Sequence, residues 1–169
     1  MQRPTWATVV GILGILFSLG GLLYSAETAA MPKMMEFERD MFTQMQKDME
    51  AQKKNGQDMK PMLDMMDKFW GHQPEWFGTA SVVLGLVGLL INGLYFYSSI
   101  ALLLMKKHSL PFMYTSIACS VTLIIVRSFI LAAGYAILGL GMVVMGLIGA
   151  VLDLVLLVVI LTSDKKAFA

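Results

Sequence analysis

Four long runs of apolar residues, separated by shorter polar or charged segments, divide this 169-residue sequence. They cover about residues 6–26, 77–105, 111–134 and 136–162. Each run has the roughly 20 residues that a helix needs to cross the hydrocarbon core of a bilayer. A spanning segment must satisfy its own backbone hydrogen bonds, so each run is predicted to be a helix rather than a lone strand. The pattern predicts an all-α membrane protein with four transmembrane helices in a single domain, residues 1–169.

The composition supports this interpretation. Hydrophobic residues make up 57% of the chain, charged residues 15%, and the mean hydropathy is +0.68. Soluble proteins are usually about 45–50% apolar and about 25% charged. The apolar stretch at residues 6–26 is longer than the core of a secretory signal, which has about 7–15 residues, so we expect an uncleaved first span. Nothing in the net charge of +1 indicates a nucleic-acid partner.

The basic residues of the short flanking segments predict the orientation. Arg3 and the lysine pairs 106–107 and 165–166 all fall on one side of the predicted bundle. The positive-inside rule places this side, with both termini, in the cytoplasm. The absence of a glycosylation sequon favours a bacterial inner (plasma) membrane. Aromatic residues typical of membrane–water boundaries occur near the ends of the runs: Trp6, Tyr24, Trp70, Trp76, Phe77, residues 95–97, Phe112, Tyr114 and Tyr135.

The segment between the first two runs, about residues 31–75, has the periodicity of an amphipathic helical hairpin. Apolar residues recur at steps of three and four over residues 32–54 and again over residues 58–70. The Asn55-Gly56 dipeptide between them is a turn signal. We therefore predict an extracytoplasmic hairpin with two amphipathic arms. Ten of the fifteen methionines lie in this segment: Met31, Met34, Met35, Met41, Met45, Met49, Met59, Met62, Met65 and Met66.

These methionines have two main interpretations, and a lipid-binding surface, with Trp70 and Trp76 at the membrane interface, is a further alternative. Methionine is a flexible apolar residue typical of adaptable binding surfaces, and here it occupies positions where any amphipathic helix would carry leucine. We therefore favour a partner-binding surface formed by Met34, Met41, Met45, Met49, Met59, Met62, Met66 and Trp70. Thioethers on an extracytoplasmic face also suit Cu(I). A copper site would use Met31, Met34, Met35 and His72, and no other cofactor is predicted.

Three polar residues, Arg127, Asp153 and Asn92, lie inside predicted spans. A charged side chain at the bilayer centre costs about 2.5–3.5 kcal/mol on insertion scales, so each charge needs a partner or water. The helical rise places Arg127 and Asp153 at depths that differ by roughly 5–10 Å, which leaves a direct ion pair between them open. We favour structural or intersubunit pairing over a small channel or transporter that would use Arg127 and Asp153.

No catalytic motif is recognisable. Phosphate loops, HExxH and GxSxG sequences are absent, and there are only two histidines, His72 and His108. We therefore predict that the protein is not an enzyme. The single cysteine, Cys119, is expected to be a packing residue. Small residues that predict close helix packing recur in the spans: Gly11, Gly14, Ser18, Gly78, Gly85, Gly88, Gly93, Gly139, Gly141, Gly146 and Gly149.

The predicted layout is similar in outline to that of tetraspan families such as the claudins and tetraspanins. It has a long external loop, then a short basic inner loop, then a tight outer turn. The similarity is one of topology, because the external-loop cysteines of those families are absent, and no residue roles follow from it. The sequence predicts a non-catalytic tetraspan accessory subunit. It would assemble, stabilise or regulate a larger membrane complex, or self-associate, through its hairpin and helix faces.

Overall fold

The computed structural model describes residues 4–52, 74–134 and 138–165, and these are almost entirely helical. The helices are α1 (Thr5–Gln52), α3 (Trp76–Leu103), α4 (Ser109–Gly134) and α5 (Leu138–Thr162). The predicted all-α class is therefore confirmed for the described part of the chain. Three helices, α1, α3 and α4, are long and apolar enough to cross a membrane.

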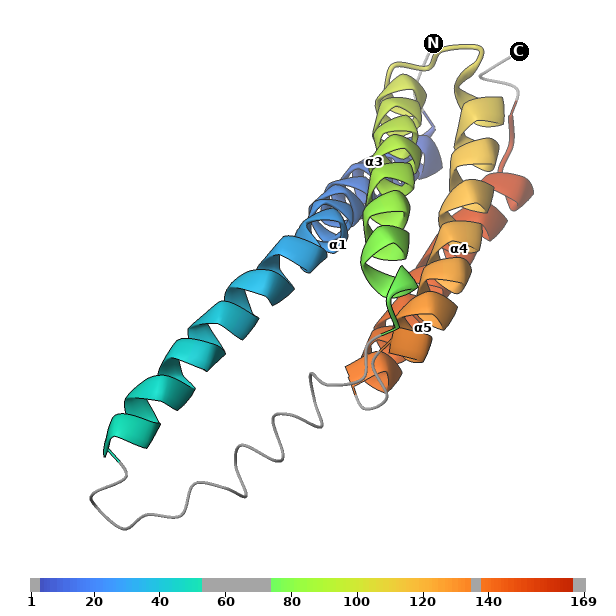
Figure 1. The fold of residues 1–169 in the computed structure, drawn as a ribbon. Helices are drawn as coiled ribbons and strands as arrows, with labels where there is room; N and C mark the ends of the chain where they lie inside the picture. Colours follow the sequence, from blue (N-terminus) through green and yellow to red (C-terminus); the bar gives the residue numbers. More distant parts are fainter. Residues whose placement is uncertain (1–3, 53–73, 135–137, 166–169) are drawn as a thin grey trace.

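The helices pack in the order of the sequence. α1 lies against α3, α3 against α4 and α4 against α5, whereas α1 and α5 touch only slightly (Figure 1). The start of α1, the connection between α3 and α4, and the end of α5 lie at the same end of the bundle. We call this the terminal end. The second half of α1 extends beyond the opposite end, away from the other helices.

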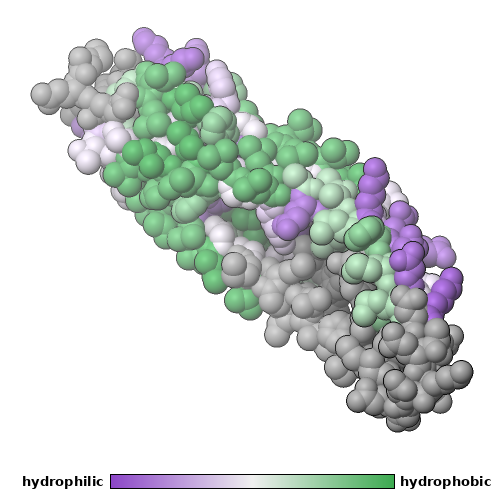
Figure 2. Space-filling view, turned by 90° about the vertical axis from the view of Figure 1, so that its left-hand side faces the viewer, coloured by the Kyte–Doolittle hydropathy of each residue, from purple (hydrophilic) through white to green (hydrophobic). Residues whose placement is uncertain are grey.

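The bundle has an apolar exterior and polar groups inside. Leu23, Leu90 and Phe129 are 75%, 76% and 74% exposed, whereas many serines are buried. On the face seen in Figure 2, hydrophobic residues cover the four-helix part, and hydrophilic residues gather at the ends and along the extension of α1. This distribution suits contact with hydrocarbon, because an exposed leucine costs nothing in lipid while a buried serine can bond within the protein.

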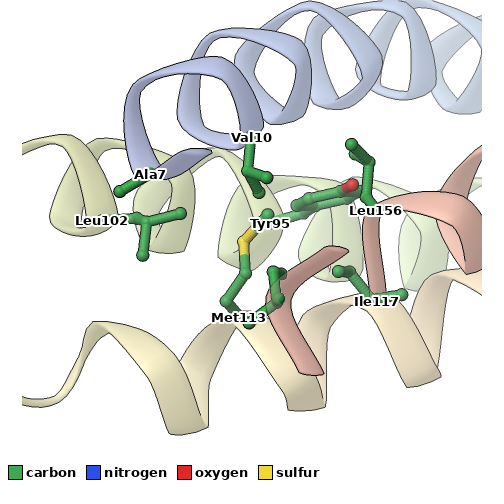
Figure 3. Close-up of a cluster of buried hydrophobic side chains, with 8 residues drawn as sticks. Ala7, Val10, Tyr95, Leu102, Met113, Ile117 and Leu156 are labelled. Atoms are coloured by element: carbon green, nitrogen blue, oxygen red, sulfur yellow. The ribbon is translucent and has the colours of Figure 1, made fainter. Parts of the chain in front are cut away.

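A cluster of apolar side chains holds the four helices together near the terminal end (Figure 3). Each helix contributes two residues, and all of them are at most 4% exposed. Tyr95 of α3 lies among the others, with its ring between the helices. The cluster consists of Ala7, Val10, Tyr95, Leu102, Met113, Ile117, Leu156 and Ile160.

Where the sequence predicts a span at residues 6–26 and a separate arm at residues 32–54, the structure has one helix of 48 residues. The intervening residues include no glycine, and alanines at positions 26, 29 and 30 favour continuation. Pro32 lies inside the helix and removes one backbone donor without ending it. The predicted second arm, residues 58–70, lies outside the described residues.

α3 ends at Leu103, two residues earlier than predicted. Met105 has a left-handed backbone with φ 55°. Its N–H donates to Leu102 O at 3.1 Å, and the N–H of Lys106 donates to Ala101 O at 3.1 Å. This pair of bonds is the Schellman arrangement that caps a helix C-terminus, with methionine in place of the usual glycine. The predicted outer turn between α4 and α5 includes residues 135–137, which lie outside the described part.

The α1–α3 interface depends on glycine at several crossing points. A Cβ added to Gly85 would lie 2.5 Å from the backbone nitrogen of Ala29, and one added to Gly88 would meet the Ser25 hydroxyl. These contacts confirm the prediction of close packing at both glycines. Gly93 differs, because a Cβ there would meet nothing within 4 Å. The prediction was wrong for Gly93.

Candidate functional site

A cavity of about 650 Å³ lies between the four helices, on the side of the apolar cluster away from the terminal end. All three polar residues predicted from the spans, Arg127, Asp153 and Asn92, line it. The rest of the wall is largely apolar, with glycines of α1 and α5 leaving space where side chains would otherwise fill it. The structure therefore brings the predicted intramembrane polar residues together around one space.

Arg127 of α4 binds across the bundle to α1. Its Nη2 donates to Thr28 Oγ1 at 2.7 Å and to the carbonyl of Tyr24 at 3.3 Å. Its guanidinium carbon also lies 4.1 Å from the centroid of the Tyr24 ring, a cation–π contact. The residue is only 5% exposed. Arg127 thus finds a hydroxyl, a carbonyl and a ring on α1.

Asp153 of α5 is held by two hydroxyl donors from other helices. Tyr95 of α3 donates to Oδ1 at 3.0 Å, and Ser120 of α4 donates to Oδ2 at 2.7 Å. The carboxylate is 3% exposed. These two bonds tie α3, α4 and α5 to one another through a single side chain. They meet the requirement that a buried carboxylate be hydrogen-bonded.

Asn92 of α3 lies between these two groups along the cavity wall. Its amide nitrogen donates to Gly88 O at 2.8 Å and to Ser25 Oγ of α1 at 3.3 Å. A Cβ at Gly21 would collide with the Asn92 side chain, so glycine at that position makes room for the amide. Asn92 therefore cross-links α1 and α3, the role that polar side chains commonly have between membrane helices.

Arg127 and Asp153 do not form a salt bridge with each other. Ser120, which holds Asp153, lies seven residues before Arg127 on α4, and this separates the two sites by about 10 Å along the helix axis. The question left open by the sequence is thereby answered, since each charge has its own partners. The two charges stand toward opposite ends of the same cavity.

Four residues that hold the charges were not singled out as partners from the sequence: Tyr24, Thr28, Tyr95 and Ser120. Tyr95 was predicted to lie at a water boundary, but it is 1% exposed and central to the bundle. Hydropathy cannot distinguish a boundary tyrosine from one that carries its hydroxyl to a buried carboxylate. The four-residue spacing of Tyr24 and Thr28, which puts them on one face of α1, was the available signal.

The Thr28 hydroxyl gives a test of the Arg127 site. Thr28→Val keeps the shape of the side chain and removes the acceptor 2.7 Å from Nη2, so we expect the free energy of unfolding to fall by about 1 kcal/mol. Thr122→Val is the matched control, because the Thr122 hydroxyl bonds only to Ala118 O of its own helix and the residue is exposed. SDS-induced unfolding followed by circular dichroism measures both. Equal losses in the two variants would contradict the assigned role.

The methionines of the first predicted arm lie on α1. Met34, Met41 and Met45 are each about half exposed, at 50%, 49% and 50%. Met31 and Met35 are partly buried in the same helix, and the side chain of Met49 is outside the described part. The remaining residues predicted for the partner surface or the metal site lie outside the described residues: Met59, Met62, Met66, Trp70 and His72.

Comparisons with protein-family models, with curated proteins and with solved structures find no match to this chain. The class of the protein therefore comes from its own geometry. In the described residues it is a helical bundle with three helices able to cross a membrane, an apolar exterior and a polar-lined cavity. This description is compatible with an integral membrane protein.

Proposed function

We propose that this protein is a non-catalytic tetraspan subunit of a larger membrane assembly, and that α1 is the helix through which it binds its partner. α5 supplies the fourth span in this proposal, since its 25 residues give about 37 Å of helix. The terminal end, with Lys106 and Lys107, faces the cytoplasm of a bacterial cell. The extension of α1 then lies on the extracytoplasmic side.

A stripe of exposed residues along α1 is the observation that carries the proposal. Leu16, Leu23, Ala30 and Phe37 recur every seven residues and are all exposed. Met34 and Met41, also exposed, are seven residues apart: Met34 lies between Ala30 and Phe37, and Met41 follows Phe37 by four residues. Apolar residues at this spacing form the seam of a left-handed helix pair. We call these six residues the α1 seam.

The seam continues from the part of α1 packed in the bundle to the part beyond it, with a drift of about 20° around the helix for every seven residues. Leu16 and Leu23 lie in the apolar half of the helix, whereas Phe37 and Met41 lie among exposed charged residues such as Glu36. A lipid molecule could cover only the first half. A long helix of another membrane protein, which crosses the bilayer and continues outward beside α1, would cover both halves. This continuity is why we assign the seam to a helical partner subunit.

Substitution of Phe37 tests this assignment. Phe37 is 69% exposed, so Phe37→Glu leaves the packing of this chain unchanged and places a charge in the seam. We expect the wild-type particle in mild detergent to contain more protein mass than one 18.6 kDa chain, and the variant to contain one chain. Light scattering coupled to size-exclusion chromatography measures the protein mass.

Thr43→Glu is the control, because Thr43 is exposed in the same segment and lies about half a turn away from Met41. It introduces the same charge outside the seam and should leave the particle mass unchanged. A wild-type particle of a single chain, or an unchanged mass in Phe37→Glu, would rule out the seam as the binding surface.

The two other functions considered from the sequence have less support. A small transporter is favoured by one observation, the presence of Arg127 and Asp153 in a common cavity. The apolar cluster lies between this cavity and the terminal end in the described residues, and an apolar barrier there does not favour the passage of ions. Copper binding stays a prediction, since Met31, Met34 and Met35 are on α1 while His72 lies outside the described residues.

A further inference from the structure

The cavity between the helices has the size and composition of a ligand site. Its volume of about 650 Å³ falls within the roughly 300–1,000 Å³ typical of small-molecule pockets, and its wall is largely apolar with a few polar groups. It is lined by residues of both α1 and α5, which touch only slightly, so the bundle leaves it open between these two helices. A molecule could therefore enter from the side, out of the lipid.

Arg127 is the polar group in this cavity that lacks a full set of partners. No carboxylate of the described residues lies within 4.0 Å of its guanidinium, and its Nε–H is buried without an acceptor. Thr28 and the Tyr24 carbonyl supply only neutral acceptors. A buried guanidinium without an anion is costly in a medium of low dielectric constant. The site is therefore complementary to an incoming acidic group.

Asp153 differs from Arg127 in this respect. Each of its oxygens already accepts a hydrogen bond from a hydroxyl group, from Tyr95 and from Ser120. The carboxylate also points into the part of the bundle that adjoins the apolar cluster, to which Tyr95 belongs. Among the described residues that line the cavity, Arg127 is thus the one with a buried polar atom that lacks a hydrogen-bond partner, and its positive charge favours an anion.

The position of Arg127 suits the head group of an amphiphile. α4 ends at Gly134, seven residues after Arg127, so the guanidinium lies about 10 Å along the axis from the end of the helix. An acidic head group bound there stays near the water boundary. The apolar wall extends from Arg127 toward the cluster and includes Leu16, Phe17, Leu123 and Leu152. It offers a surface for an acyl chain.

We infer that this cavity binds one anionic amphiphile taken from the membrane, with its carboxylate or phosphate group on Arg127 and its acyl chain along the apolar wall. This inference does not rest on a partner subunit, although Leu16 belongs both to the cavity wall and to the α1 seam. Recognition rests on the charge of the head group, because a neutral lipid would leave the guanidinium without an anion. Oleate and dioleoyl phosphatidic acid represent the two possible head groups.

The experiment uses the full chain in phosphatidylcholine nanodiscs. Oleate or dioleoyl phosphatidic acid is titrated in, and the bound ligand is counted by native mass spectrometry. We expect one acidic lipid per chain, bound at least about tenfold more tightly than its neutral counterpart, oleyl alcohol or dioleoylglycerol. Comparison of the two acids shows whether the head group is a carboxylate or a phosphate. Arg127→Gln should remove the preference for the acid.

Two glycine substitutions test the location without touching Arg127. Gly20 lines the cavity and a Cβ there would meet nothing within 4 Å, so Gly20→Leu fills part of the space without a clash. It should weaken binding of the acid at least about tenfold. Gly93→Leu is the matched control, since Gly93 also has open space around it but does not line the cavity. The Gly93→Leu protein should bind the acidic lipid as tightly as the wild-type protein does.

Three results would overturn the inference. The first is equal binding of the acids and their neutral counterparts to the wild-type protein. The second is a folded Arg127→Gln protein that keeps the preference for the acid. The third is unchanged binding in Gly20→Leu, which would place the ligand elsewhere even if Arg127→Gln fails to fold.

Discussion

Replacement of Tyr95 with alanine is expected to lower the free energy of unfolding by roughly 3 kcal/mol. Tyr95 is 1% exposed and lies in the apolar cluster where all four helices meet, so its removal leaves a cavity that the helices cannot close without moving. The substitution also removes the hydroxyl that donates to Asp153 at 3.0 Å. A carboxylate buried in the bundle then loses one of its two donors. SDS-induced unfolding followed by circular dichroism measures the loss.

Tyr95→Phe separates the two contributions. This variant keeps the aromatic ring in the cluster and removes only the hydroxyl that donates to Asp153. We therefore expect the free energy of unfolding to fall by less, about 1 kcal/mol. Tyr97→Ala is the control for removal of a tyrosine ring, because Tyr97 is 51% exposed on the same helix. The assignment of Tyr95 to the core fails if Tyr97→Ala costs as much as Tyr95→Ala.

Gly85→Leu is expected to destabilise the fold by roughly 3 kcal/mol or more. A Cβ at Gly85 would lie 2.5 Å from both the Cβ and the backbone nitrogen of Ala29, and 2.7 Å from its Cα. The obstacle is the backbone of α1, so a change of rotamer cannot relieve it and the two helices must separate. Separation weakens the α1–α3 contact, in which Asn92 and Ser25 also meet. The same unfolding assay measures the effect.

Gly93→Leu provides the comparison at a second glycine of α3. A side chain at Gly93 meets nothing within 4 Å, and leucine is a better helix former than glycine, so the variant should be as stable as the wild type or slightly more stable. Similar losses in Gly85→Leu and Gly93→Leu would show that the close approach of α1 and α3 at Gly85 is not needed for stability.

The helices themselves were predictable from the sequence, because hydropathy over about 20 residues reports directly on helices that lie in hydrocarbon. The predicted and observed ends of the helix at residues 111–134 agree closely with Ser109–Gly134. The continuation of α1 through Pro32 was not predicted. A proline weakens a helix at one position only, and the surrounding alanines and long side chains are enough to carry the helix past it.

The candidate site was only partly predictable. Arg127, Asp153 and Asn92 were identified because polar residues in an apolar run are costly and so require partners. The partners themselves were not identified. Thr28, Tyr95 and Ser120 are common residues in membrane helices, and nothing in their neighbours along the chain distinguishes a hydroxyl that bonds a charge from one that bonds its own helix, as Thr122 does.

By itself, the sequence determined that this protein is helical, that its long apolar helices suit a membrane, and that Arg127 and Asp153 need partners inside the bundle. These conclusions rest on local properties, namely hydropathy, helical periodicity and the cost of a charge in hydrocarbon. The tertiary structure decided that the two charges remain apart, which hydroxyls hold them, and that they share one cavity. The rotation of the helices and the angles at which they cross fix these contacts. Rotation and crossing depend in turn on packing between residues distant in sequence, such as Gly85 against Ala29.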